Sequence, residues 1–200
     1  QSRPPGRLAH QMTPLPQHLT AILWMLGTLL SLCLMSLAAR ELSVVYDTAQ
    51  ILFIRNLFGL TVILLIMVRT GTGITRTHQP VMQVMRNLVH LVAVSTWFWG
   101  ITQLPLVEVF VLESTMPIWV TILATLLLGE QLTRSRVTGV ILGFIGVLII
   151  LRPGLAIVDP AALVVLAGAI AFAGAAVATK TLTRTDAPLT ILFWMFVVQL

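Results

Sequence analysis

Six long runs of apolar residues, separated by short polar segments, dominate the pattern along the chain. A membrane-spanning helix needs about 20 mostly apolar residues. Runs of this kind cover residues 19–39, 49–68, 81–101, 105–128, 137–151 with its flanks, and 161–179. A seventh run begins near Leu189 and reaches Leu200, the last residue of the sequence. The pattern predicts an all-α polytopic membrane protein with six complete spans and the start of a seventh.

Composition agrees with a chain surrounded by a lipid bilayer. Of the 200 residues, 58% are hydrophobic and 10% are charged, whereas soluble domains carry about 25% charged residues. The net charge of +5 would suit nucleic acid, but the basic residues are dispersed singly between apolar runs and form no patch. Nucleic acid is therefore not an expected partner. Cys33 is the only cysteine, which excludes a disulfide framework.

Residues 1–18 are rich in proline and lack apolar periodicity, so we expect a disordered cytoplasmic tail. Arg3 and Arg7 ahead of an apolar run would also suit a signal peptide cleaved after residues 36–38. The run 19–39 is too long for a typical signal sequence, and further spans follow it.

The distribution of lysine and arginine predicts the orientation, because these residues concentrate in cytoplasmic loops. With the N-terminus in the cytoplasm, eight basic residues lie inside: Arg3, Arg7, Arg69, Arg76, Arg134, Arg136, Lys180 and Arg184. Only Arg40 and Arg152 then lie outside. We expect a multi-pass protein of the plasma membrane with a cytoplasmic N-terminus.

An internal repeat appears when the sequence is shifted by 140 residues. The segment 38–53, AARELSVVYDTAQILF, then falls on 178–193, ATKTLTRTDAPLTILF, without a gap. Five spans separate the two copies, so the second copy enters the membrane from the opposite side. Inverted repeats are a recurring plan of secondary transporters, with the substrate site near the midplane between the copies.

The segment 104–154 resembles the EamA-type domain of the drug/metabolite transporter superfamily. The residues that carry the resemblance are Leu104-Pro105-Leu106 with Glu108, Pro117, Gly129-Glu130, Gly139, Gly143 and Gly146, and Arg152-Pro153-Gly154. Arg55 and Arg86 also fall where this family often has arginine, whereas Glu113 replaces a residue that is more often small or neutral.

The resemblance implies ten helices arranged as two five-helix inverted repeats, and a secondary carrier of small metabolites in the inner membrane of a bacterium. It divides the chain into the tail, a first EamA-type repeat over 19–154, and the start of a second repeat over 155–200. The second repeat is then mostly missing, so the chain resembles a fragment. A homodimer is left open.

Glu113 and Arg55 are candidate pathway residues, since charges inside hydrocarbon cost at least about 2.5–3.5 kcal/mol and usually face a cavity or a partner. Both lie on the order of 10 Å below the outer surface at 1.5 Å per residue. Equal depth permits an ion pair. The pair would either line the pathway, where the carboxylate binds a cation or proton, or lock two helices together. Glu108, one turn inside Pro105, is a candidate for substrate contact at the entrance.

Arg86, His90 and Trp97 share one helical face in the third span, at i, i+4 and i+11. A cation, an imidazole and an aromatic ring on one stripe suit a cavity wall, and His90 could couple transport to protons. Alternatively, Arg86 extends to the cytoplasmic interface, and Trp97 joins Trp99 in an interfacial aromatic belt.

Pro117 lies within the fourth span and predicts a kink that frees a backbone carbonyl toward a cavity. Gly139, Gly143 and Gly146 give the fifth span a smooth face, which favours close helix packing and would also allow helices to slide. Glu130, beside Arg134 and Arg136, is expected to be structural.

The sequence contains no nucleotide-binding loop, HExxH, GxSxG or metal-ligand cluster. No cofactor or metal is expected. The favoured function is therefore secondary transport driven by an ion gradient or by exchange. A non-transporting membrane module, such as a truncated relic or helper subunit, and an intramembrane enzyme using His90 and Glu113 are the alternatives.

Overall fold

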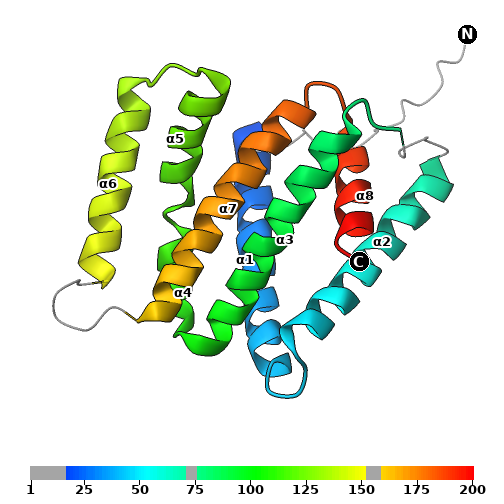
Figure 1. Cartoon of the computed structure of the whole chain (residues 1–200), viewed down its shortest axis with the longest axis horizontal. Coiled ribbons are helices and arrows are strands. Elements are labelled where there is room, and N and C mark those ends of the chain that lie inside the picture. The colour runs from blue at the N-terminus through cyan, green and yellow to red at the C-terminus, as the bar shows by residue number, and fades with distance from the viewer. Residues whose placement is uncertain (1–16, 71–75, 152–158) are drawn as a thin grey trace, which may run out of the picture. The chain divides into compact units, whose positions relative to one another are not determined.

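The computed structural model describes residues 17–70, 76–151 and 159–200, which contain helices and no strand. Figure 1 labels the helices along the chain. They are α1 Gln17–Leu42, α2 Thr48–Thr70, α3 Pro80–Gln103, α4 Leu106–Glu113, α5 Met116–Leu128, α6 Arg134–Leu151, α7 Pro160–Leu182 and α8 Pro188–Val198. The all-α polytopic membrane fold predicted from the apolar runs is confirmed.

The helices divide into two units, residues 1–38 and 39–200. The described part of the first unit belongs to the apolar helix α1, which begins at Gln17 and continues past this boundary to Leu42. Residues 1–16 lie outside the described part of the chain, as do Arg152, Pro153 and Gly154.

Among the described residues, four stretches of helix are long and apolar enough to cross a membrane: His18–Leu42, Thr48–Thr70, Leu106–Leu128 and Pro160–Leu182. The predicted spans at 81–101 and 137–151 form helices α3 and α6 but fall outside this group. Polar residues interrupt the apolar sequence of α3, and the last two residues of α6 have side chains outside the described part of the chain. Among the described residues, apolar length and composition thus support four of the six predicted spans, and helices are present at the other two positions.

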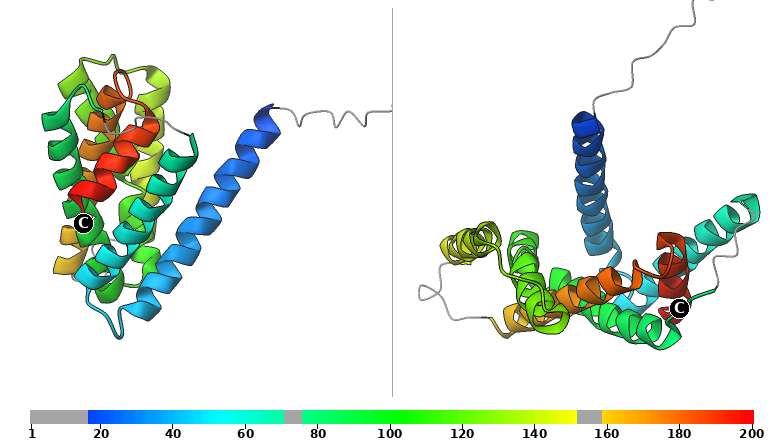
Figure 2. Two further views of the ribbon diagram at one scale, coloured as in Figure 1. Left: turned by 90° about the vertical axis from the view of Figure 1, so that its right-hand side faces the viewer. Right: turned by 90° about the horizontal axis from the view of Figure 1, so that it is seen from above.

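Within the second unit, α6, α5, α7, α3, α8 and α2 follow one another, and each contacts the next (Figures 1 and 2). The tightest pair is α3 with α7. A Cβ atom added at Gly100 would lie 2.3 Å from Val165 Cγ2, and one added at Gly168 would lie 2.2 Å from Thr96 Oγ1. The missing side chains of both glycines therefore let the two helices approach closely.

The fourth predicted span is one stretch of helix with a break. The helix stops at Glu113 and resumes at Met116, with Pro117 in the first turn of α5. Proline lacks the N–H that would bond back to the preceding turn. The hydroxyls of Ser114 and Thr115 donate to the carbonyls of Val111 and Leu112, at 2.6 Å each. The break lies three residues before the proline, which places Glu113 at a helix end.

The repeat found in the sequence is present in the backbone. The turn after α1 and the turn after α7 have the same local structure when shifted by 140 residues. Val44 N–H donates to Glu41 O as Arg184 N–H donates to Thr181 O, and the flanking bonds correspond in the same way. The side chains of the two turns differ, so backbone geometry is what the copies share.

Candidate functional site

Helix α3 carries a stripe of polar side chains into the interior of the second unit. Gln83 and Asn87 are fully buried, and Trp97 is 6% exposed. Arg86 and His90, between them in the sequence, are partly buried. The stripe faces α7 and α8, because each of its members described below bonds or packs against residues of these helices or of the broken span.

The first half of the stripe forms a hydrogen-bond network that joins four helices. Arg86 Nε donates to Thr179 Oγ1 on α7 at 2.9 Å, and its terminal nitrogen donates to Asn87 Oδ1 at 2.7 Å. Gln199, at the end of α8, donates from its amide nitrogen to Asn87 O at 3.2 Å. The backbone carbonyl oxygen of Gln199 accepts a hydrogen bond from Asn56 Nδ2 on α2 at 2.8 Å.

His90 joins this network through Gln199. The Gln199 amide nitrogen lies 2.9 Å from His90 Nδ1. Because an amide nitrogen only donates, Nδ1 accepts and the neutral ring carries its proton on Nε2. The ring of Phe172 on α7 packs edge-on against the imidazole, with 5.6 Å between centroids. His90 is thus held in one orientation by a polar and an aromatic neighbour.

Three buried polar atoms of this region have no hydrogen-bond partner among the described residues: Asn56 Oδ1, Gln83 Oε1 and Asn87 Nδ2. Leaving such an atom unpaired costs about 1–3 kcal/mol. Native structures contain few unpaired buried polar atoms, and a bound molecule or ion is one explanation for those that occur. Two amide oxygens and one amide nitrogen of this region can therefore each form a further hydrogen bond.

The second half of the stripe meets the break in the fourth span. Trp97 Nε1 donates to Glu113 Oε2 at 2.9 Å, and the Arg55 guanidinium lies over the Phe98 ring at 5.9 Å from its centroid. The rings of Trp97 and Phe98 pack edge to face at 5.2 Å. The carboxylate and the guanidinium are thus linked through two neighbouring aromatic residues.

The predicted ion pair between Glu113 and Arg55 is not among the ion pairs of the described chain. Equal depth is consistent with the structure, because the two groups contact residues adjacent on α3. Their side chains nevertheless approach α3 from different helices, and the indole takes the place at the carboxylate that the arginine was expected to fill. Arg55 has the Phe98 ring as its described partner.

Of the remaining predicted residues, Trp97 and Arg86 make contacts in the interior, whereas Glu108 lies outside the network. Trp97 is buried and bonded, so it does not belong to an interfacial belt, whereas Trp99 is 38% exposed. Arg86 bonds to Thr179 in the interior rather than extending to the interface. Glu108 is partly buried in the first turn of α4 and is separate from the network.

A cavity of about 690 Å³ borders the network on the side of α2, and we call it the α2–α3 cavity. Its walls include Leu52 and Phe53 of α2, Leu91 and Ser95 of α3, and Gln199. Binding sites for small molecules have roughly 300–1,000 Å³. Gln199 therefore connects a space of suitable size to His90 and Asn87.

Sequence reasoning missed several members of this network: Asn56, Asn87 as a bonded partner, Thr179 and Gln199. A single amide within an apolar run has no periodic signal. The available signal was the cost of such groups in hydrocarbon, which applies to Asn56 as it does to Arg55.

Asp186 was also missed, and it fastens the turn between α7 and α8 to the start of α3. Its carboxylate accepts hydrogen bonds from the hydroxyl of Thr77, from His78 N at 3.1 Å and from Gln83 Nε2 at 2.9 Å. Burial by itself raises the pKa of Asp186, but the bonds from Thr77, His78 and Gln83 outweigh it and the pKa is lowered. The carboxylate therefore holds this corner in its charged form.

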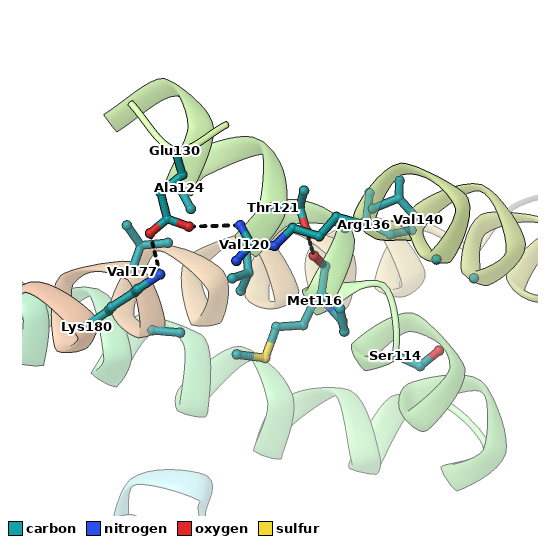
Figure 3. Close-up of a pocket in the computed structure, with 15 residues that line it drawn as sticks. Ser114, Met116, Val120, Thr121, Ala124, Glu130, Arg136, Val140, Val177 and Lys180 are labelled. Carbon is teal, nitrogen blue, oxygen red and sulfur yellow. Dashed lines mark hydrogen bonds and ion pairs between the residues drawn. The ribbon is translucent and has the colours of Figure 1, made fainter. Parts of the chain in front are cut away.

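On the other side of α7, Glu130 joins three helices at one end of the bundle. Its carboxylate bonds to Lys180 of α7 and, at 2.9 Å, to Arg136 of α6 (Figure 3). The bonds from Lys180 and then Arg136 lower the pKa of Glu130. Its expected structural role agrees with these contacts.

A second cavity, of about 700 Å³, lies between α5, α6 and α7 beneath these charges, and we call it the α5–α6 cavity. Gly139 and Gly143 line it, and a Cβ atom added at either, or at Gly146, would meet nothing within 4 Å. The described chain places no helix close to these glycines, so the close packing predicted for them remains a prediction. The absent side chains widen a gap instead of allowing a helix to approach.

Comparison with known proteins identifies the relatives of the chain. The model of the EamA-like transporter family matches residues 19–152. An S-adenosylmethionine uptake transporter of Rickettsia prowazekii is 26% identical over 92% of this chain and 63% of its own length. A riboflavin transporter of Brucella anthropi is 34% identical over 74% of this chain and 52% of its own.

A pseudopaline exporter of Pseudomonas aeruginosa is 27% identical over 82% of this chain and 58% of its own length. The chain thus spans between 52% and 63% of the length of these relatives. No solved structure matches it. The relatives are named as transporters and not as enzymes, so these names do not support the intramembrane enzyme considered from the sequence.

Proposed function

The chain belongs to the EamA-like transporter family, and on that premise we propose that it forms one wall of a secondary transport pathway for a small metabolite. The wall is the polar stripe of α3 together with the broken span. We place it in the inner membrane of a bacterium with the N-terminus in the cytoplasm, as the distribution of basic residues predicts.

The observation that carries this proposal is the gathering of polar groups on α3 inside an apolar bundle. Intramembrane ionisable residues are rare and usually mark substrate or ion pathways. Arg86 and His90 of α3 and Glu113 of α4 make bonds along one face of α3. Three buried polar atoms nearby have no hydrogen-bond partner in the part of the chain that the structure describes. A purely structural core would be expected to satisfy such atoms.

The break in the fourth span supports the same role. In secondary transporters, discontinuous helices often form the binding site and direct their ends at the ligand. Glu113 is the last residue of α4, where the helix dipole adds partial negative charge to that of the carboxylate. This point of the wall attracts a cation or a proton, which makes Glu113 the proposed coupling residue.

Transport is proposed to follow an ion gradient or exchange, because the sequence has no nucleotide-binding loop. The relatives are named for S-adenosylmethionine, riboflavin and pseudopaline, and they include both an uptake transporter and an exporter. These names suggest a small organic cargo. S-adenosylmethionine and riboflavin are the first two probes.

Flux into sealed vesicles tests the proposal. The purified protein is reconstituted in proteoliposomes, and uptake of radiolabelled riboflavin and S-adenosylmethionine is measured with and without an imposed proton gradient. We expect gradient-driven accumulation of one probe. Glu113→Gln should abolish the dependence on the gradient, since the amide keeps the size of the side chain but cannot titrate.

Glu41→Gln is the matched control, because Glu41 is exposed near the end of α1 and should leave flux unchanged. Flux that is present but keeps its gradient dependence in Glu113→Gln would contradict coupling through this residue. If the vesicles accumulate neither probe, a panel of other metabolites is tested in the same way. Accumulation of none of them would contradict the transport function itself.

A further inference from the structure

The α5–α6 cavity is separate from the wall proposed for transport. Residues of α5, α6 and α7 line it, and none of its lining residues comes from α3. Helix α7 lies between α5 and α3 and contacts both (Figure 1). The role of this cavity must therefore be considered separately from the transport pathway.

The walls of this cavity suit hydrocarbon. They include Met116, Val120, Gly139, Val140, Gly143 and Val177. The hydroxyls of Ser114 and Thr121, which also line it, donate to carbonyls of their own chain segment, Val111 O at 2.6 Å and Pro117 O at 2.8 Å. The wall thus directs no unused donor into the space, and an apolar occupant loses no hydrogen bond there.

The mouth of the cavity is charged and carries an excess of positive charge. Figure 3 shows the Glu130 carboxylate between Lys180 and Arg136, which come from different helices. These two cations neutralise one carboxylate and leave a net charge of about +1. The side chains of Lys180 and Arg136 are 49% and 47% exposed, so both can contact a further anion.

The mouth lies where helices end, and the cavity extends inward from it. Glu130 follows the end of α5, Arg136 is in the first turn of α6, and Lys180 is in the last turn of α7. The cavity reaches Met116 at the start of α5, which is about 20 Å away along 13 residues. One leaflet offers about 15 Å of hydrocarbon, half of the bilayer core.

We propose that the α5–α6 cavity binds one acyl chain of an anionic phospholipid, whose phosphate is held by Arg136 and Lys180. The apolar cavity is at least as long as one leaflet is thick, and its mouth supplies positive charge at the level of the head groups. Basic pockets between membrane helices bind anionic head groups in this way. The proposal is independent of whether the protein transports a metabolite.

Native mass spectrometry of the purified protein in detergent provides the test. The protein is incubated with phosphatidylglycerol or with phosphatidylcholine of the same chains, and the bound fraction is compared. We expect preferential retention of one phosphatidylglycerol. Arg136→Gln and Lys180→Gln should each weaken that preference about fivefold, which corresponds to about 1 kcal/mol per basic residue at a membrane surface. Arg184→Gln is the control, because Arg184 is exposed nearby but does not line the cavity.

A second pair of variants tests whether the chain enters the cavity. Gly143→Leu places a side chain in it, whereas Gly146→Leu adds the same side chain to the same helix outside the lining. Neither added Cβ meets an atom within 4 Å, so both variants should fold. Gly143→Leu should lose retained lipid, and Gly146→Leu should keep it.

Three results would overturn the proposal. The first is equal retention of the two lipids by the unaltered protein. The second is full retention in Gly143→Leu. The third is displacement of the lipid by glycerol phosphate alone, because a site that recognises only the phosphate has no need of the cavity.

Discussion

At the scale of single residues, the interior charges are held by neutral partners. Arg86 bonds to a hydroxyl and an amide, Glu113 bonds to an indole, and Arg55 lies over an aromatic ring. Such contacts orient a charge without neutralising it. The charges therefore remain able to attract an ion or a charged group of a substrate, as an internal ion pair would not.

Asp186 allows a pH-dependent prediction at this scale, since it lies outside the spans. A carboxyl with a lowered pKa in the folded protein stabilises the fold above its unfolded pKa, about 3.9. That stabilisation is lost as the pH falls through the folded value. Asp186→Asn should lower the free energy of unfolding by about 1–3 kcal/mol at pH 7, and the difference from the unaltered protein should shrink below about pH 4.

Thermal unfolding in detergent between pH 3 and pH 8 checks this expectation. Asp47→Asn is the matched control, because Asp47 directly follows the equivalent turn after α1 and is exposed. A loss of stability in Asp186→Asn that is the same at every pH would show that the carboxylate charge is not what holds the corner.

At the scale of elements, the contact of α3 with α7 positions the polar stripe. Thr96 Oγ1 already donates to the carbonyl of Ala93 at 2.9 Å, at the point where Gly168 approaches. The two helices meet at glycines on both sides. This contact fixes the depth at which Arg86 and Thr179 face each other.

Gly168→Ala should therefore destabilise the fold by about 1–3 kcal/mol, the usual cost of overpacking. Gly174→Ala on the same helix is the control, because its added Cβ would lie 3.7 Å from Val89, an ordinary contact distance. It should be neutral or more stable by up to about 1 kcal/mol, because glycine weakens helices. Thermal unfolding in detergent measures both, and equal stability of the two variants would contradict the close contact.

The elements were predictable because apolar length and proline position are local signals. The neighbours that each helix and side chain contacts were not predictable from these signals. Depth in the membrane was derived from residue counting, but it does not specify the direction of a side chain around the helix, and Glu113 bonds to Trp97 as a result. Likewise, Gly139 and Gly143 permit a close approach, but nothing in their spacing supplies a helix that makes it.

The site was predictable only where a residue is costly in hydrocarbon. Arg86, His90 and Glu113 were identified for that reason, and each takes part in described interactions of the interior. Asn56 and Gln199 were missed because a lone amide gives a weaker signal than a charge. Their role depends on segments 143 residues apart meeting in space, which no local pattern contains.

At the scale of the whole molecule, the repeated turn implies an inverted arrangement. The turns at 43–46 and 183–186 have the same backbone bonds, and an odd number of predicted spans separates them. If the spans cross as the basic residues predict, the same turn faces opposite sides of the membrane in its two copies.

Cysteine labelling tests this arrangement. Val44 and Arg184 are equivalent under the shift of 140 residues, and both are exposed. In a Cys33→Ser background, Val44→Cys should react with an impermeant maleimide added to intact cells. Arg184→Cys should react only after the membrane is opened. Labelling of both from the same side would contradict the inverted repeat.

The hydrogen bond between Trp97 and Glu113 has an optical consequence. Excitation of an indole moves electron density from the pyrrole nitrogen toward the benzene ring, so a negative charge beside that nitrogen lowers the energy of the excited state. Trp97 is buried and donates to the carboxylate at 2.9 Å. Its emission therefore depends on the charge of Glu113, and whatever neutralises that carboxylate will shift the light that this tryptophan emits toward the blue.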